Sequence, residues 1–340
     1  MVGCPDVRRD ADTVVRGADV ASISLNDFAP RSSARGLLGR LAMSKPRQIL
    51  PGQFYMITRR CTQRLFLLRP DAATNNAFVY CLAVAALRCE VDVLLTVAAS
   101  NHHHTVIFDR HGRCSEFVEH FHRLMARSQN ALRGRWENFW ASGEPCITRL
   151  LDRDAVVAKL VYAATNPVKD RLVERVHHWP GVNSYATFRA GRALEATRPR
   201  HFFRTSGPTP ESVTLPLTVP SELGAAAVLI AEVKAAVEAI EKQVAEERKA
   251  TGAPVMGRRA VLAQSWNTSP QSEEPRRNLR PRFAGSTEVR VHALAQYCEF
   301  LDAYRKARKQ WLGGATPMFP RGTYWLSRFA AVLVASAVPV

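Results

Sequence analysis

The stretch 91–108, VDVLLTVAASNHHHTVIF, decides the fold of this chain. Its halves, 91–98 and 102–108, are apolar and rich in β-branched residues, and the short turn Ala99-Ser100-Asn101 separates them. Two such runs joined by a short turn are typical of antiparallel strands that lie next to each other in a buried sheet.

The segments around this hairpin predict an α+β domain. Residues 53–60 (QFYMITRR) have the composition of a strand, and helices are expected over 75–89, which an Asn would cap, and over 115–132. A third helix is expected over 154–165, begun by Asp154 and ended by Pro167. The order of elements favours a ferredoxin-like antiparallel sheet with helices on one face.

The chain divides by composition into four parts. Residues 1–42 show no sustained periodicity and are expected to be a disordered extension, and 43–200 hold the α+β domain. A Pro/Ser/Thr-rich linker is expected over 201–220. The remainder, 221–340, is expected to be a mostly helical, basic region with long helices over 221–252 and 288–312.

Charge is the outstanding feature of the composition. The 340 residues include 47 Lys and Arg against 30 Asp and Glu, a net charge of +17, which points to a polyanionic partner. The seven cysteines contain no C-x-x-C pair, which excludes a zinc knuckle and favours reduced thiols in the cytoplasm. No secretory signal is recognisable, and the apolar end at 329–340 is about half the ~20 residues of a spanning helix, so no membrane association is expected.

Two short motifs carry side chains suited to catalysis. His102 and His104 alternate on one strand, so both imidazoles point to the same face and can chelate one divalent ion with a third ligand from elsewhere. Lys159, Tyr162 and Asn166 share one helix face at i, i+3 and i+7. Taken singly, these residues are better explained as a polar strand end and a core tyrosine.

Together the two motifs resemble a known family. A strand with H-x-H, followed by a helix with Y-x-x-x-N-P-V at 162–168, is similar to the HUH single-tyrosine transposases of the insertion-sequence 200 type, and most to the REP-associated tyrosine transposases. The segments 46–60 and 179–185 look like the first strand and the closing W-P-x-x-x-S-Y segment of that family. The resemblance covers roughly 43–190, and His103 departs from it, because the family usually has a hydrophobic residue there.

The resemblance implies an enzyme that cleaves and rejoins single-stranded DNA near hairpins. His102, His104 and Asn166 would hold Mg²⁺ or Mn²⁺, and Tyr162 would attack the phosphorus to form a 5′-phosphotyrosine link. Lys159 would favour the phenolate or clamp a phosphate, unless it is simply a solvated lysine. Such an enzyme is expected to act as a monomer or a homodimer.

Contacts to DNA are expected from basic and aromatic side chains. The basic candidates are Arg59, Arg60, Arg64 and Lys169. Trp136, Phe139 and Trp140 would either stack on unpaired bases or pack in the core.

Two alternative functions stay open at this point. The first is a non-catalytic, domesticated nucleic-acid-binding protein on the same fold. The second is a metal-dependent phosphodiesterase that uses water in place of Tyr162 as the nucleophile.

Overall fold

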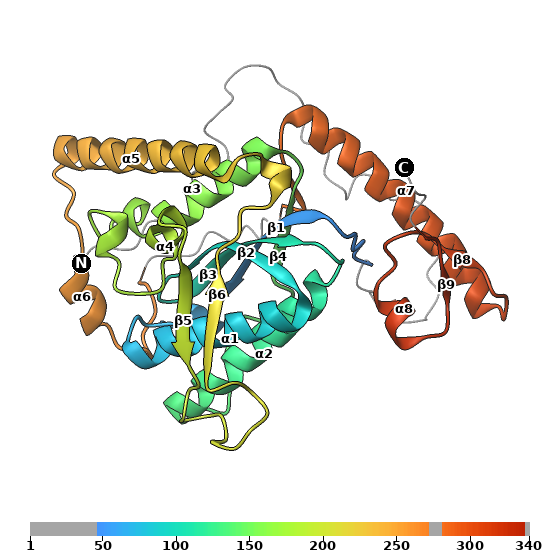
Figure 1. Ribbon diagram of the computed structural model, residues 1–340, viewed down its shortest axis with the longest axis horizontal. Coiled ribbons are helices and arrows are strands. Elements are labelled where there is room, and N and C mark those ends of the chain that lie inside the picture. The colour runs from blue at the N-terminus through green and yellow to red at the C-terminus, as the bar shows by residue number, and fades with distance from the viewer. Residues whose placement is uncertain (1–45, 272–280, 337–340) are drawn as a thin grey trace, which may run out of the picture.

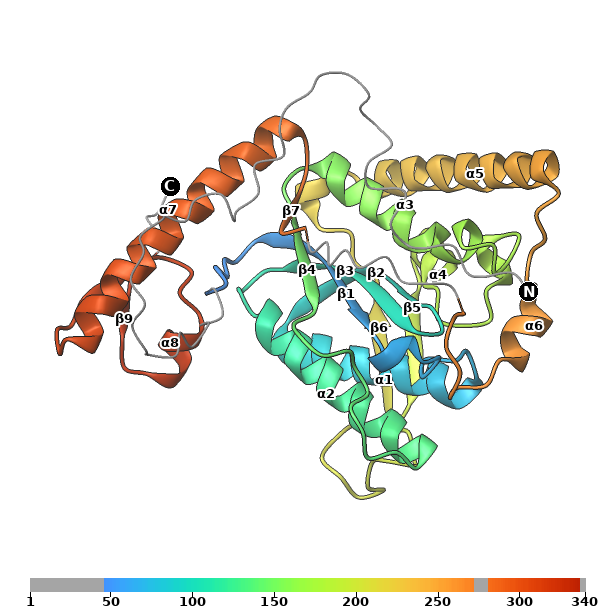
Figure 2. The ribbon, with the colours of Figure 1, turned by 180° about the vertical axis from the view of Figure 1, so that it is seen from behind.

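The computed structural model describes residues 46–271 and 281–336. The expected disordered extension, 1–42, lies outside these residues. A five-stranded mixed sheet forms the centre of the molecule, with the strand order β2-β3-β1-β4-β7 (Figures 1 and 2). Its strands are β1 (Gln53–Arg60), β2 (Val91–Ala98), β3 (His102–Asp109), β4 (Cys146–Leu150) and β7 (Phe283–Ala284).

Strands β1 to β4 pair antiparallel with one another, and the predicted hairpin is present as β2 and β3. The short β7 adds to β4 in parallel, so the sheet is mixed and not purely antiparallel as expected. In β1 and β3, Thr58 lies opposite His104 and Arg60 lies opposite His102. This register places Thr58 and Arg60 on the same face of the sheet as the two histidines.

Helices cover both faces of the sheet, which corrects the expectation that they lie on one face. Helices α1 (Ala72–Cys89) and α2 (Cys114–Arg133) lie on one side, and α3 (Arg153–Lys169) and α5 (Ala226–Thr251) lie on the other (Figures 1 and 2). Helix α1 begins earlier than expected because Asp71, and not an Asn, is its cap and accepts a 2.8 Å hydrogen bond from the Thr74 amide.

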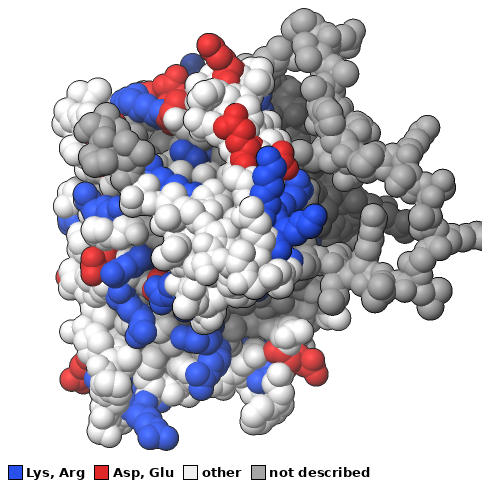
Figure 3. All heavy atoms as spheres, turned by 90° about the vertical axis from the view of Figure 1, so that its right-hand side faces the viewer, with Lys and Arg blue, Asp and Glu red and all other residues white. Residues whose placement is uncertain are grey.

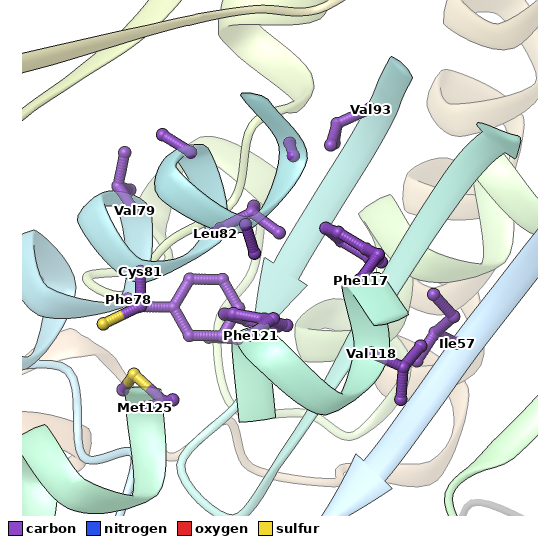
Figure 4. Packing of buried hydrophobic residues seen from close by; sticks show 14 of the residues in the cluster. Ile57, Phe78, Val79, Cys81, Leu82, Val93, Phe117, Val118, Phe121 and Met125 are labelled. Carbon is purple, nitrogen blue, oxygen red and sulfur yellow. The ribbon is translucent and has the colours of Figure 1, made fainter. Parts of the chain in front are cut away.

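The first face of the sheet is packed by aromatic and aliphatic side chains of α1 and α2. Phe78 of α1 and Phe121 of α2 meet edge to face, with 5.3 Å between ring centroids, above Ile57 of β1 and Val93 of β2 (Figure 4). These side chains are fully buried. Odd-numbered residues of β3 face this layer, since Ile107 belongs to it.

The second face of the sheet is packed by α3, the short α4 (Tyr185–Arg189) and α5. Val106 and Phe108 of β3 lie in this layer with Leu160 of α3 and Val233 of α5. Even-numbered residues of β3 therefore face α3. The sheet register brings His102 and His104 to the helix that carries Tyr162 and Asn166.

The segment 201–220, expected as a linker, contains a strand. Strand β6 (Ser212–Pro216) pairs with β5 (Ala193–Thr197), and its Val213 and Leu215 are buried against the core. The composition of the segment did not indicate a strand because only two of the five residues of β6 enter the core. The other three residues of β6 are exposed, so the stretch has the polar composition of a linker.

The C-terminal region contributes to the central sheet and extends away from it. It contains β7, α6 (Arg258–Ala263), α7 (Thr287–Leu312), α8 (Trp325–Phe329), β8 (Met318–Phe319) and β9 (Leu333–Val334). Helix α7 leaves the body of the molecule, and α8 returns toward α2, where Arg328 pairs with Glu116 (Figure 2). Over the described residues, no helix combines the length and the apolar character needed to cross a membrane.

Candidate active site

The candidate site lies between β3 and α3. The His102 and His104 rings are edge to face with 4.8 Å between centroids, and the Tyr162 ring of α3 lies edge-on to His104 with 5.2 Å between centroids. Asn166, one turn further along α3, is close enough to act on the pKa of His102. The structure therefore brings together four of the five side chains that the two sequence motifs contain.

Three atoms of this group are buried and have no hydrogen-bond partner: Nε2 of His102, Nε2 of His104 and Oδ1 of Asn166. The residues that carry them are 7%, 2% and 3% exposed. A buried polar atom without a partner costs about 1–3 kcal/mol, so three in one place call for an explanation. A bound cation would be coordinated by all three.

The histidines are held in the form that a metal ion requires. Asn101 Oδ1 lies 2.7 Å from His102 Nδ1, while the Asn101 amide nitrogen donates to the Arg64 carbonyl. The carbonyl oxygen can only accept, so His102 Nδ1 carries the proton and Nε2 presents a lone pair. His104 Nδ1 is bonded to Thr58 Oγ1 at 2.7 Å, which orients that ring in the same way.

Burial keeps both imidazoles neutral. It lowers the pKa of His102 to about 4, with a further contribution from the charge of Arg60, and the Asn166 side chain opposes the shift. Burial also lowers the pKa of His104 well below its usual value, aided by His102, His103 and Lys159. Neutral imidazoles at pH 7 are the form that binds cations.

The residues present fit a divalent ion. Two imidazole nitrogens and one amide oxygen form a mixed donor set that leaves positions for water or substrate oxygens. Among the described residues, no three His, Cys, Asp or Glu side chains form a metal-binding group, so a third ligand from this group would have to be the Asn166 amide oxygen.

Two lysines flank the tyrosine. Lys159 Nζ lies 5.4 Å and Lys169 Nζ lies 5.9 Å from the centroid of the Tyr162 ring. Burial lowers the pKa of Lys159, Cys146 opposes this, and the charge of Lys169 adds to it. Two positive charges beside a phenol favour its phenolate form.

His103 faces away from the candidate site. Its Nε2 bonds to Nε2 of His122 at 2.8 Å, and its Nδ1 bonds to the hydroxyl of Thr105 at 3.1 Å. Both ring nitrogens are engaged under α2, so His103 does not compete for a cation at the site.

Sequence reasoning missed two residues, His122 and Thr58. His122 lies on the apolar face of α2, four residues after Val118 and three before Met125, a spacing that marks a core position. Thr58 had no local signal, because only the pairing of β1 with β3 places it opposite His104.

The basic residues expected to contact DNA lie in different surroundings. Arg59 points to the α2 side, where its guanidinium bonds to His122 Nδ1 at 3.1 Å and lies over the Trp140 ring. Arg60 is exposed and shares the face of His102, and Lys169 is half-buried beside Tyr162. Lys and Arg are spread widely over the end of the molecule that α7 and α8 form, with fewer Asp and Glu (Figure 3).

Comparison with known proteins gives little beyond this geometry. The sequence matches no protein-family model, and no curated protein matches it. One solved structure, a REP-associated tyrosine transposase bound to a REP hairpin, aligns with 53% of this chain and 96% of its own, at 15% identity and a TM-score of 0.37. A likeness of this strength assigns neither a family nor an activity.

Proposed function

We propose that this protein is a tyrosine-dependent DNA strand transferase, which cleaves and rejoins single-stranded DNA with a divalent cation. The observation that supports this most directly is the convergence of three unpartnered lone pairs beside a tyrosine that two ammonium groups flank. The net charge of +17 supports a polyanionic substrate.

In this proposal Tyr162 is the nucleophile. Its phenolate oxygen forms a bond to the scissile phosphorus, the bond from phosphorus to the 3′ oxygen breaks, and that oxygen takes up a proton. The products are a 5′-phosphotyrosine and a free 3′-hydroxyl. The phosphodiester energy is kept in the covalent link, so the reverse attack by a 3′-hydroxyl rejoins a strand without ATP.

The other side chains have separate tasks. His102, His104 and Asn166 would hold Mg²⁺ or Mn²⁺, which would act as a Lewis acid toward the scissile phosphate. Lys159 and Lys169 would stabilise the phenolate before attack. Thr58 and Asn101 would keep the two imidazoles oriented.

A covalent-capture assay tests the proposal. Labelled single strands, with and without a hairpin, are incubated with protein and Mn²⁺ or Mg²⁺ and separated on a denaturing gel. We expect a protein–DNA band that requires the metal, disappears in Tyr162→Phe and persists in Tyr304→Phe. Tyr304 is a suitable control because its ring packs on Phe300 and Phe319, in the C-terminal region.

The other outcomes separate the alternatives. Cleavage that survives Tyr162→Phe and leaves no DNA on the protein would replace the proposal with a phosphodiesterase that uses water. Salt-sensitive DNA binding without any cleavage would replace it with a non-catalytic binding protein.

A further inference from the structure

Trp136 is the most exposed large hydrophobic residue described, at 96%. It belongs to the loop 134–141, which follows α2 and also contains Phe139 and Trp140. These two are 2% and 7% exposed, so they pack in the core, as one of the two sequence-based alternatives held. Packing of the fold therefore explains two of the three aromatic side chains and leaves Trp136 without a structural role.

The loop that carries Trp136 is firmly held. Gly134 ends α2 in the left-handed conformation, and the Asn130 side-chain amide donates a 2.8 Å hydrogen bond to the Glu137 carbonyl. Further on, the Thr62 backbone amide donates to the Phe139 carbonyl at 2.9 Å, and the Ala141 backbone amide donates to the Arg60 carbonyl at 2.8 Å. The exposed indole is thus presented from a fixed backbone, which lowers the entropy cost of binding.

The loop lies at the end of the sheet where the candidate active site begins. The Cys61 amide donates to the Asn101 carbonyl at 2.7 Å, next to His102, and Cys61 also bridges to Trp140. Trp136 is three residues from Phe139, a chain length of at most about 11 Å. A strand of nucleic acid bound at His102 would reach this loop within a few nucleotides.

The surroundings of the loop suit a phosphate backbone. The Arg135 guanidinium is half-buried 5.9 Å from the Trp266 ring, and Arg60 is exposed at the adjoining end of β1, whereas Arg133 is paired with Asp71 at 2.7 Å. Glu137 is the one acidic residue of the loop 134–141. Exposed aromatic rings among arginines are typical of surfaces that bind unpaired nucleotides.

We propose that Trp136 stacks on an unpaired base of the DNA strand whose scissile phosphate lies at the candidate active site. The inference rests on the proposed function for the identity of the strand. An unpaired base is required, because in a duplex the neighbouring base pairs cover both faces of each base.

The test measures equilibrium binding without metal, so that no cleavage takes place. The affinity for a labelled single strand is compared with that for an all-abasic strand of equal length and charge, for wild type, Trp136→Ala and Trp136→Phe. Trp325→Ala is the matched control, since Trp325 is 47% exposed on α8 at another part of the molecule.

We expect Trp136→Ala to weaken binding of the normal strand about 5- to 150-fold, the value of stacking one base on an aromatic side chain. Trp136→Phe should retain part of the affinity, and Trp325→Ala should retain all of it. On the abasic strand, wild type and Trp136→Ala should bind equally.

Two outcomes would overturn the inference. Equal loss on the normal and abasic strands would show that Trp136 supports the backbone contacts and not a base. Unchanged affinity in Trp136→Ala would show that the indole takes no part in binding. Either result is independent of covalent capture, which tests Tyr162 with the Trp136 side chain in place, so failure of one proposal can be told from failure of the other.

Discussion

Thr58 is the residue whose substitution tests the geometry of the site most directly. Its hydroxyl is hydrogen-bonded to His104 Nδ1 at 2.7 Å, and His104 is 2% exposed. Thr58→Val replaces the hydroxyl by a methyl group of nearly the same size. The imidazole then has a second buried nitrogen without a partner, in addition to Nε2.

The magnitude of the effect follows from that loss. Leaving one buried polar atom unpaired costs about 1–3 kcal/mol of unfolding free energy. In a chain of 340 residues each kcal/mol lowers the Tm by roughly 1–2 °C. Loss of an outer-shell hydrogen bond to a metal-binding histidine lowers the affinity for the metal ion about 10- to 100-fold.

Two measurements check this prediction. Urea unfolding without metal gives the stability, and Mn²⁺ titration by calorimetry gives the affinity, for wild type, Thr58→Val and Thr58→Ser. Thr58→Ser keeps the hydroxyl and should stay near wild type in both, while His104→Ala should lose Mn²⁺ binding. If Thr58→Val binds Mn²⁺ as tightly as wild type, the reasoning about the orientation of His104 is refuted.

Three further predictions concern the framework of the site. Asp152→Ala should lower the unfolding free energy by about 1–2 kcal/mol in urea melts, because the Asp152 carboxylate accepts hydrogen bonds from the backbone amides of Ala155 at 2.7 Å and Ser286 at 2.8 Å. An unchanged urea midpoint would contradict its role as the cap of α3. Gly181→Ala should destabilise the fold by at least about 1 kcal/mol, since its Cβ would lie 2.5 Å from Trp179 Nε1, which donates to the Ala98 carbonyl; a wild-type Tm would refute this. The unfolding free energy should fall from pH 7.5 to 5, because burial holds the pKa of His122 well below 6.5, so that at pH 5 the unfolded chain binds a proton that the folded chain does not. The loss is up to about 2 kcal/mol for each such imidazole. Equal stability at both pH values would contradict this prediction.

Local sequence patterns predicted the strands of the site well. The expected strands at 53–60 and 91–98 match β1 and β2, and the expected 102–108 matches β3 to within one residue. The reason is that β-branched runs separated by a tight turn leave few alternatives. Helix α3 is the exception, because it continues through Pro167 to Lys169, and Val168 in this last turn is buried.

Long-range pairing was beyond the sequence. Two residues of β7 join the sheet from more than 130 positions away, and nothing in their own composition marks them as a strand. Helices cover both faces because α3 packs on β2 and β3 opposite α1 and α2, with α5 packed on α3, and no local pattern encodes these contacts. Which side chains of the site share a face was predictable, because it follows from the alternation of residues along β3 and from the helical spacing along α3.

The two faces of β3 explain why three consecutive histidines occur in a buried strand. Even-numbered His102 and His104 keep Nε2 without a protein partner on the α3 side, while odd-numbered His103 has both nitrogens bonded on the α2 side. A network built only for stability would satisfy all three rings, as it does for His103. The strand instead leaves two ring nitrogens without a partner on the side that faces Asn166 of α3. The cost of burying unpaired polar atoms is therefore confined to the face of β3 that packs against α3, the helix that carries Tyr162. That asymmetry is the strongest structural argument for a ligand at this site.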